Sequence, residues 1–158
     1  VGDIVPGLRL AHRGFLQGIF VAEDIAGLNP AVIDESGIPR VTFCEPEIAS
    51  VGLTERAARE KYGDAVRTVE YNLAGNGKSN ILGTAGFIKL VSVENGPIVG
   101  FHGIGSRIGE QIGEGELMVN WEAYPSDVAS LIHAHPSQNE SIGEAAMALA
   151  GKPLHAHN

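Results

Sequence analysis

The 158-residue chain contains a single cysteine, Cys44, and this scarcity excludes an internal disulfide. One thiol also leaves no cysteine pair for thiol–disulfide exchange within the chain. This cysteine usage suits a reducing compartment, so we expect a cytoplasmic location. Cys44 lies in a run of residues with high strand propensity, and we expect it to be a core residue of that strand.

Long apolar runs and basic residues are scarce as well. No apolar run approaches the roughly 18–20 residues that a membrane-spanning helix requires, and the N-terminus lacks the basic and apolar regions of a signal peptide. The chain has 11 basic and 19 acidic residues, which gives a formal charge of −8. A nucleic-acid surface needs clustered Lys and Arg. We therefore expect neither a membrane nor a nucleic acid as a partner.

The glycine-rich motifs that bind nucleotides are also missing. No G-x-G-x-x-G opens a strand–helix unit. The stretch 74–80 contains G-K-S, but the P-loop pattern requires a glycine at position 72, which is occupied by Asn72. We interpret 74–80 as a flexible surface loop.

The residues that are present predict one main domain, with 44% apolar and 19% charged residues. Periodicity and turn residues predict a helix from Leu10 to Gly27, a strand over 40–44, a helix over 55–62, a strand around 69–73, a hairpin of strands 86–93 and 97–104, helices over 106–123 and 125–132, and a last helix ending at Gly151. Ser106 is expected to cap its helix, and the glycines that follow to allow close approach of another helix. This order predicts an α+β fold in which helices pack against one face of an antiparallel sheet.

Residues 133–140, H-A-H-P-S-Q-N-E, carry the most distinctive chemistry. Ser137 and Glu140 have the spacing of a capping box, so one interpretation is that Glu140 only caps a helix. Alternatively, Glu140 bonds one ring nitrogen of His135, fixes its tautomer and leaves the other nitrogen for a substrate. Pro136 favours this arrangement, because it restricts the backbone of His135 and accepts a cis bond.

Other histidines suggest less. His102 stands alone on an apolar strand and is interpreted as a partly buried structural residue. The pairs His133-x-His135 and His155-x-His157 raise the alternative of metal binding. Neither pair has cysteine partners, so we predict no metal site.

The stretch H-A-H-P-S-Q-N-E resembles the H-A-H-P-T-x-x-E signature near the C-terminus of dihydrolipoamide dehydrogenases, which are flavin-dependent disulfide oxidoreductases. Ser137 replaces the usual Thr and keeps a hydroxyl for the cap. The resemblance implies that His135 is the base that works with the redox thiols and that Glu140 orients it. It also implies that His133 is not the base.

Two further stretches extend the resemblance. V-G-D-I followed by L-R-L-A-H is similar to the flavin-binding segment of the family, and P-R-V-T-F-C-E-P-E-I-A-S-V-G-L-T-E to the entry into its dimerisation domain. The first implies that Asp3 bonds the ribityl chain of FAD, and that Leu10, Ala11 and His12 open a helix aimed at the flavin ring. The chain would then divide into residues 1–32, a remnant of the FAD-binding domain, and 33–158, the interface domain.

In the family, protein-bound dihydrolipoamide is oxidised through a cysteine pair and FAD, and NAD⁺ is reduced. The resemblance therefore implies a homodimer, in which the histidine serves the disulfide of the partner subunit, and lipoyl domains of 2-oxoacid dehydrogenase complexes as partners. Because the chain begins with Val1 and lacks a cysteine pair, we expect a C-terminal part of a longer enzyme. By itself, it is expected neither to bind FAD nor to turn over lipoamide.

Two alternatives remain open. Glutathione reductases share an H-P-T-x-x-E ending, so the chain is also compatible with the dimerisation domain of such a flavin disulfide reductase. A dimerisation module without catalysis is the second alternative. The H-A-H and L-A-H stretches favour the lipoamide branch.

Overall fold

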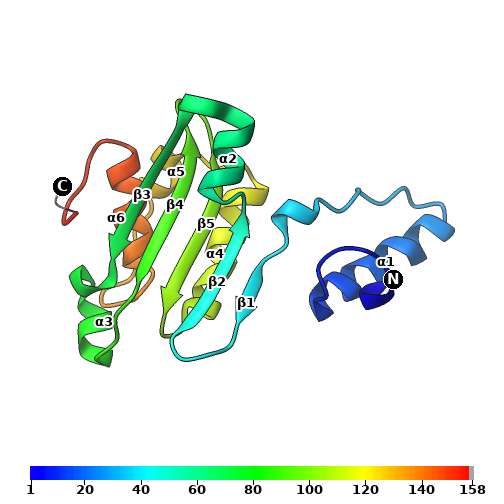
Figure 1. Ribbon diagram of the computed structural model, residues 1–158, viewed down its shortest axis with the longest axis horizontal. Coiled ribbons are helices and arrows are strands. Elements are labelled where there is room, and N and C mark those ends of the chain that lie inside the picture. The colour runs from blue at the N-terminus through cyan, green and yellow to red at the C-terminus, as the bar shows by residue number, and fades with distance from the viewer. Residues whose placement is uncertain (157–158) are drawn as a thin grey trace. The chain divides into compact units, whose positions relative to one another are not determined.

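The computed structural model describes residues 1–156 and shows two compact units, Val1–Ile38 and Pro39 onward. Figure 1 gives the order of the elements. None of the helices in the described part of the chain is both long and apolar enough to cross a membrane.

The first unit is built around one helix, α1 (Ala11–Ile25), flanked by the short 3₁₀ turns η1 (Gly2–Ile4) and η2 (Glu35–Gly37). The buried Arg13 organises it. Its guanidinium donates to the carbonyls of Pro6 at 2.8 Å and Leu8 at 3.2 Å, and its Nε lies 2.7 Å from Oε1 of Glu35. One side chain thereby fastens the loop before α1 and the turn η2 to the helix.

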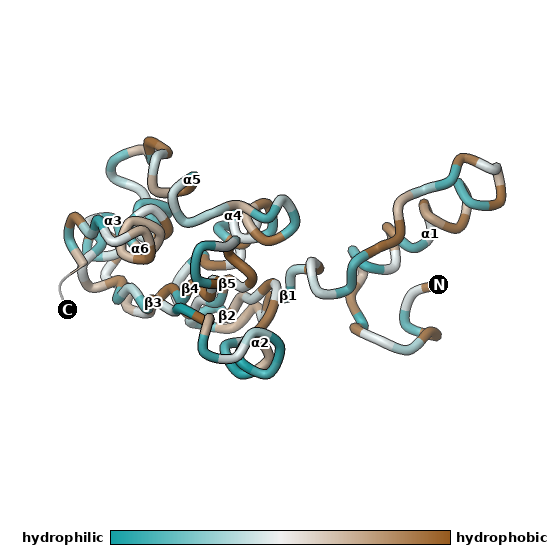
Figure 2. Tube along the Cα trace, turned by 90° about the horizontal axis from the view of Figure 1, so that it is seen from above, coloured by the Kyte–Doolittle hydropathy of each residue, from teal (hydrophilic) through white to brown (hydrophobic). Residues whose placement is uncertain are grey.

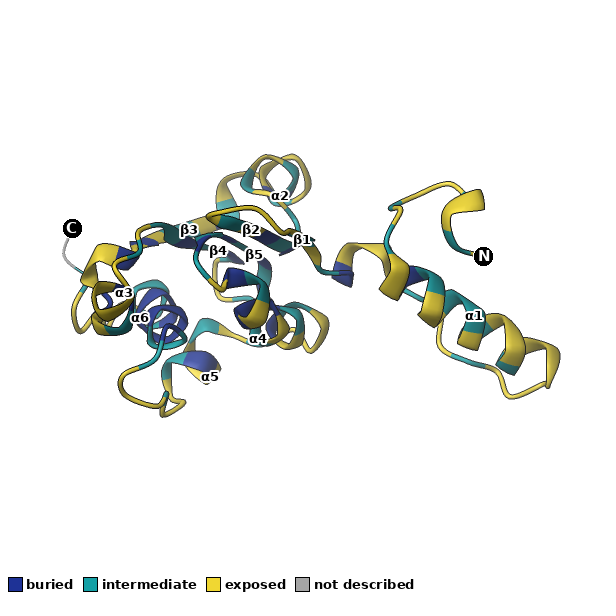
Figure 3. Cartoon of the chain, turned by 90° about the horizontal axis from the view of Figure 1, so that it is seen from below, coloured by how far each residue is buried: buried dark blue, intermediate teal, exposed yellow. Residues whose placement is uncertain are grey.

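The predicted helix in this unit is confirmed, and Gly2 and Asp3 before it form the 3₁₀ turn η1. The apolar stripe of α1 is largely exposed. Phe15, for example, is 73% exposed, and Figure 3 shows much of the helix in the colour of exposed residues. Because these apolar side chains are not buried, they contribute little to the stability of α1.

The second unit contains a five-stranded antiparallel sheet with the order β1-β2-β5-β4-β3. Its strands are β1 (Arg40–Thr42), β2 (Glu47–Gly52), β3 (Val66–Asn72), β4 (Phe87–Val93) and β5 (Ile98–Gly105). The hairpin β4–β5 turns at Asn95-Gly96 as expected, with Asn95 in a left-handed conformation. Strand β2 was not predicted, because Glu47, Ala49 and Gly52 have low strand propensity.

Helices cover the sheet in layers. In Figure 2, α4 (Ile108–Asn120), α5 (Pro125–Ala129) and α6 (Glu140–Leu149) lie on one face, and α2 (Glu55–Tyr62) lies on the other. The larger core lies beneath α4 and α6 and includes Phe101, Leu90, Ile88 and Ile142, all fully buried. Each such side chain contributes about 1.5–3 kcal/mol. The predicted α+β class is confirmed, and α2 adds a smaller cluster on the opposite face.

The glycines of α4 allow a close approach, but to the sheet and not to another helix. A Cβ atom on Gly115 would lie 2.7 Å from Cγ of Phe101, and one on Gly109 would lie 3.0 Å from Cγ1 of Val41. Gly113 faces open space. The expected helix–helix contact is therefore wrong for these positions, because the bulky Phe101 fills the space over which α4 passes.

The start of α4 also differs from the prediction. Its N-cap is Arg107, in a left-handed conformation with φ of 60°, and not Ser106. Glu47 of β2 accepts a hydrogen bond from the N–H of Gly109 at 2.8 Å. A carboxylate from the neighbouring strand thus satisfies the helix N-terminus, which favours negative charge.

The prediction for Cys44 is wrong. Strand β1 ends at Thr42, and Cys44 lies in the following turn with its side chain exposed. Its thiol donates to the carbonyl of Pro46 at 3.0 Å. The turn around the cis Glu45–Pro46 bond takes Cys44 out of the sheet.

Candidate active site

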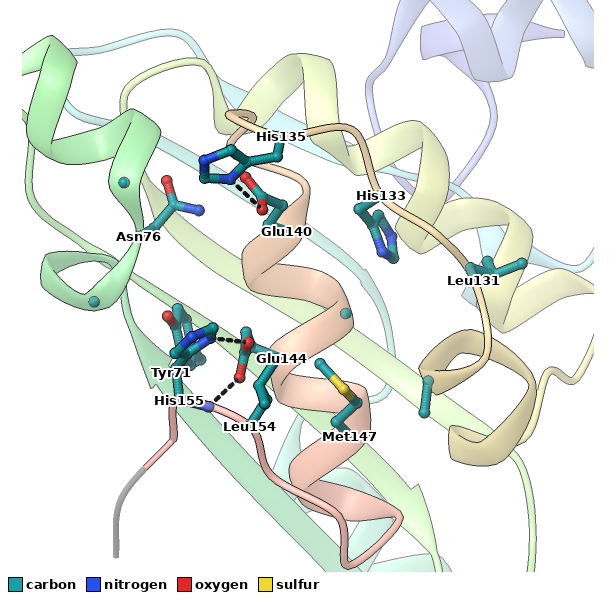
Figure 4. A pocket seen from close by; sticks show the side chains of 14 residues that line it. Tyr71, Asn76, Leu131, His133, His135, Glu140, Glu144, Met147, Leu154 and His155 are labelled. Atoms are coloured by element: carbon teal, nitrogen blue, oxygen red, sulfur yellow. Dashed lines mark hydrogen bonds and ion pairs between the residues drawn. The ribbon is translucent and has the colours of Figure 1, made fainter.

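His135 and Glu140 are in direct contact, as the spacing of the motif predicted. Nδ1 of His135 lies 2.9 Å from Oε1 of Glu140, the first residue of α6. The second oxygen of Glu140 accepts from the N–H of Ser137 at 2.8 Å. Both oxygens of the carboxylate are engaged, so its orientation is fixed (Figure 4).

This contact determines which nitrogen of His135 is available. An ionised carboxylate only accepts hydrogen bonds, so Nδ1 carries the proton and donates it to Glu140. The neutral ring then presents Nε2 as its basic nitrogen. The His135 side chain is 78% exposed, whereas that of Glu140 is only 27% exposed. A held carboxylate and an open imidazole are the arrangement of an orienting acid and a general base.

The environment of Glu140 favours its charged form. Burial by itself raises the pKa of this carboxyl, but the hydrogen bonds from Ser137 and His135 and the nearby positive charge lower the pKa below its ordinary value. Glu140 therefore stays ionised at neutral pH and remains an acceptor for His135.

The capping box exists only in part. Glu140 binds the backbone of Ser137, but the N-cap of α6 is Asn139, and within the described chain the buried hydroxyl of Ser137 has no hydrogen-bond partner. The expected hydroxyl cap is therefore wrong. Helix α6 begins at Glu140, later than the S-x-x-E pattern implies, so residues 136–138 form a turn between His135 and the helix.

The stretch 74–80 is not a flexible surface loop. It forms η4 (Leu73–Gly75) and α3 (Gly77–Leu82), joined by the buried residue Asn76. The side-chain oxygen of Asn76 caps α3 at the N–H of Ser79, and its nitrogen donates to the carbonyl of Ser137 at 2.9 Å. Asn76 thus supports the turn that carries His135. The Asn-Gly dipeptide gave no sequence signal for this role, since it also marks ordinary turns.

His133 has a carboxylate of its own. Its Nε2 lies 2.8 Å from Oε1 of Glu114 on α4. The second oxygen of Glu114 accepts from Nδ2 of Asn139 at 2.7 Å. His133 is therefore engaged away from the His135–Glu140 pair, and Glu114 is a residue that the sequence patterns did not single out.

A third histidine–carboxylate pair lies one turn along α6. Glu144, with a side chain only 8% exposed, accepts from the backbone N–H of His155 at 2.9 Å and lies 2.6 Å from its Nδ1. Tyr71 packs beside this pair (Figure 4). Burial raises the pKa of Tyr71, and the charges of Glu144 and Glu140 raise it further, so its hydroxyl stays protonated.

These groups line one cavity of about 320 Å³. Its walls come from the turn around Asn76, the segment before His135, one side of α6 and the C-terminal stretch with Leu154 and His155. The exposed ring of His135 lies on this cavity. Polar groups that converge beside a cavity are typical of a binding or catalytic site.

Within the described residues, no group of three or more His, Cys, Asp or Glu side chains is arranged so that it could hold a metal ion. His133 and His135 pair with different carboxylates. His157, the second member of the other His pair, lies outside the described residues. His102 is a structural residue, as expected: its Nε2 lies 2.9 Å from the carbonyl of Leu53, and burial lowers its pKa.

The residues expected to contact FAD lie in the first unit. Asp3 is in η1 with an exposed side chain, and η1 is tied to α1 by the N–H of Gly2, which donates to Gln17 at 2.8 Å. Helix α1 begins at Ala11 after Leu10, with no side-chain cap and no acidic residue in its first turn. The positive end of its dipole is therefore not neutralised from within the helix.

Comparison with known proteins decides the family. The model of the pyridine nucleotide-disulphide oxidoreductase dimerisation domain matches residues 38–146. The chain belongs to this family. Its match spans the sheet, α4 and the first part of α6, so the His135–Glu140 pair lies in the dimerisation domain.

Relatives in this family are similar over nearly the whole chain. The dihydrolipoyl dehydrogenase of Bacillus subtilis is 39% identical over 157 residues, which cover 98% of this chain and 33% of the relative. Mitochondrial dihydrolipoyl dehydrogenase 2 of Arabidopsis thaliana is 37% identical, with 98% and 31% covered. The chain thus spans about a third of the length of these relatives.

A solved structure supports the same fold. LpdA from Mycobacterium tuberculosis superposes with a TM-score of 0.87 at 25% identity, covering 94% of this chain and 32% of that protein. The structural likeness reaches beyond the dimerisation-domain match.

Proposed function

We propose that this chain is the dimerisation part of a dihydrolipoyl dehydrogenase and supplies a histidine–glutamate acid–base pair to the partner subunit. The observation that carries the proposal is the 2.9 Å contact between His135 and Glu140, with the ring of His135 open to solvent. The dihydrolipoyl dehydrogenases among the relatives support the choice of reaction.

In this role His135 accepts a proton at Nε2 from a thiol of dihydrolipoamide. The thiolate formed in this way is the form of sulfur that attacks a disulfide. Glu140 holds the neutral ring by its Nδ1–H and stabilises the imidazolium once the proton has moved. A positioned general base of this kind contributes roughly 10²–10⁴-fold to the rate.

The first unit is proposed to contact FAD. The N-terminus of α1, at Leu10, Ala11 and His12, would stabilise negative charge that develops on the flavin ring, and the exposed Asp3 carboxylate would accept from a ribityl hydroxyl. FAD, when bound, supplies electron transfer between the dithiol and NAD⁺. These residues would hold and polarise it, and residues 1–32 would form part of its domain, with 33–158 as the interface domain.

The remaining partners follow from the same proposal. A homodimer places His135 of one subunit beside the redox cysteines of the other, and lipoyl domains of 2-oxoacid dehydrogenase complexes deliver the substrate. The location that we propose is cytoplasmic, whereas the Arabidopsis thaliana relative is named as mitochondrial. By itself, the chain is proposed to show no turnover, because it has no cysteine pair, and to bind no FAD, because it spans about a third of the length of its relatives.

A chimera tests the proposal. The chain replaces the corresponding third of the Bacillus subtilis dihydrolipoyl dehydrogenase, and NADH formation from dihydrolipoamide is measured in the flavin-loaded dimer. The chimera is expected to turn over, and His135→Ala is expected to lower kcat by roughly 10²–10⁴-fold at unchanged flavin content. Flavin-loaded dimers without turnover would contradict the catalytic role and favour a dimerisation module.

A further inference from the structure

Glu114 binds both flanks of the turn that carries His135. Its Oε1 lies 2.8 Å from Nε2 of His133, two residues before His135. Its Oε2 accepts from Nδ2 of Asn139, the residue directly before Glu140, at 2.7 Å. One carboxylate on α4 therefore connects the two ends of the segment that holds His135 against Glu140.

The ring of His133 is confined on a second side. A Cβ atom on Gly143 would lie 2.7 Å from Nδ1 of His133, so the ring packs directly on the backbone of α6. The glycine leaves the space that lets His133 reach Glu114. Any larger residue at this position would push the ring away from the carboxylate.

Other bonds hold the middle of the turn and not its ends. Asn76 donates to the carbonyl of Ser137, and Gln138 donates to the carbonyl of Ser106 at 3.0 Å. These two bonds hold residues 137 and 138, within the turn. Glu114 instead bonds residues on either side of His135.

We propose that Glu114 is a positioning residue for the acid–base pair: by bridging His133 and Asn139 it sets the spacing at which His135 donates to Glu140. It touches no reacting group and acts through the backbone on either side of His135. The inference deepens the proposed function and rests on it, because the pair matters only if His135 is the base.

The test is the tautomer of His135 in the 158-residue chain, measured by ¹⁵N–¹H correlation of the histidine rings at a pH where they are neutral. The wild type is expected to show the Nδ1–H form at His135. Glu114→Ala is expected to lower the ratio of Nδ1–H to Nε2–H roughly fivefold, the change that loss of one typical hydrogen bond makes in an equilibrium.

Three further variants make the result specific. Glu114→Gln keeps an acceptor for Asn139, and its NH₂ donates to Nε2 of His133 in the Nδ1–H tautomer of that ring, so it is expected to restore the wild-type tautomer of His135. Gly143→Ala, which displaces His133 without altering Glu114, is expected to shift the ratio in the same direction as Glu114→Ala. Glu110→Gln removes an exposed carboxylate one turn earlier on α4 and is expected to change nothing.

A folded Glu114→Ala chain with an unchanged His135 tautomer would overturn the inference and would leave the proposed function intact. If Glu114→Ala does not fold, Gly143→Ala decides in its place, and an unchanged tautomer there overturns the inference equally. A wild-type chain without the Nδ1–H form at His135 would instead count against the proposed function itself.

Discussion

Nδ1 of His155 lies 2.6 Å from Oε1 of Glu144, one helical turn beyond the Glu140 that binds His135. The two pairs share one helix and one cavity, and both rings are largely exposed, at 78% for His135 and 68% for His155. Glu144 is almost completely buried and also accepts the backbone N–H of His155, so this pair fastens the C-terminal stretch to α6. Glu140 accepts its backbone hydrogen bond from Ser137 and not from His135, so this carboxylate holds the His135 ring without fastening the backbone of His135 itself.

Replacement of His155 by Ala is expected to destabilise the fold by about 1–2 kcal/mol, because it removes a hydrogen bond to a buried carboxylate. Chemical unfolding by urea measures the change. Lys152→Ala, in the same exposed stretch, is the control and should lie within about 0.5 kcal/mol of the wild type. Equal stability of His155→Ala and the wild type would show that the C-terminal stretch is not fastened there.

The pKa of Glu140 predicts a pH dependence with a definite sign. Its pKa in the folded chain is lowered from 4.5, so the unfolded chain binds this proton more readily. The stability that results is fully present above the unfolded pKa and is lost as pH falls through the folded pKa. Unfolding free energies of the wild type and Glu140→Gln should therefore converge below pH 4.5. A difference that stays constant over this range would contradict the account.

Asn76→Asp is expected to weaken the turn below His135. The aspartate still accepts from Ser79, but it cannot donate to the carbonyl of Ser137, and it places a second acceptor there. We expect a loss of about 2–3 kcal/mol in unfolding free energy. Asn72→Asp is the matched control, since the exposed Asn72 only accepts, from the N–H of Ala74, and an aspartate can do the same. A similar small effect of both substitutions would refute the role of Asn76.

Gly113 and Gly115, two of the three glycines of α4, should respond in opposite directions to alanine. Gly115→Ala is expected to cost about 1–3 kcal/mol, because the new methyl group collides with the buried ring of Phe101. Gly113→Ala enters open space and should gain up to about 1 kcal/mol of helix propensity. Thermal unfolding of the two variants provides the comparison. A tolerated Gly115→Ala would mean that α4 moves off the sheet at low cost.

The exposed apolar side chains near α4 and α5 predict a self-association surface. They are Leu117, Trp121, Tyr124, Leu131 and Ile132. Trp121 is 76% exposed, and aromatic residues commonly dominate interface energetics. Trp121→Glu is expected to raise the dimer dissociation constant at least about tenfold by sedimentation, with Lys61→Glu on α2 as the distant control. An unchanged constant would place the dimer contact elsewhere.

Much of the architecture was predictable because its signals are local. The helix over 55–62, the Asn-Gly turn of the hairpin and the strand over 86–93 each depend on signals within a few residues, and the structure contains all three. The contact of His135 with Glu140 belongs to this group, since only five positions separate them. The proposed acid–base role of this pair rests in addition on the resemblance to the family signature.

Some of the predictions that failed concern groups whose partners are distant in the sequence. Asn76 reaches Ser137 across 61 positions, and Gly109 is capped by Glu47 across 62. The run of strand-forming residues over 40–44 did not indicate that the strand ends at Thr42, so the exposure of Cys44 in the following turn could not be predicted.

The sequence by itself determined the α+β class, most element positions and the pairing of His135 with Glu140, because these depend on periodicity and on hydrogen bonds between near neighbours. Tertiary structure alone decided which carboxylate serves each of the other histidines, Glu114 for His133 and Glu144 for His155. The physical reason is that helix and strand propensities act along the chain, whereas packing of α4, α6 and the C-terminal stretch brings together groups that no local pattern relates.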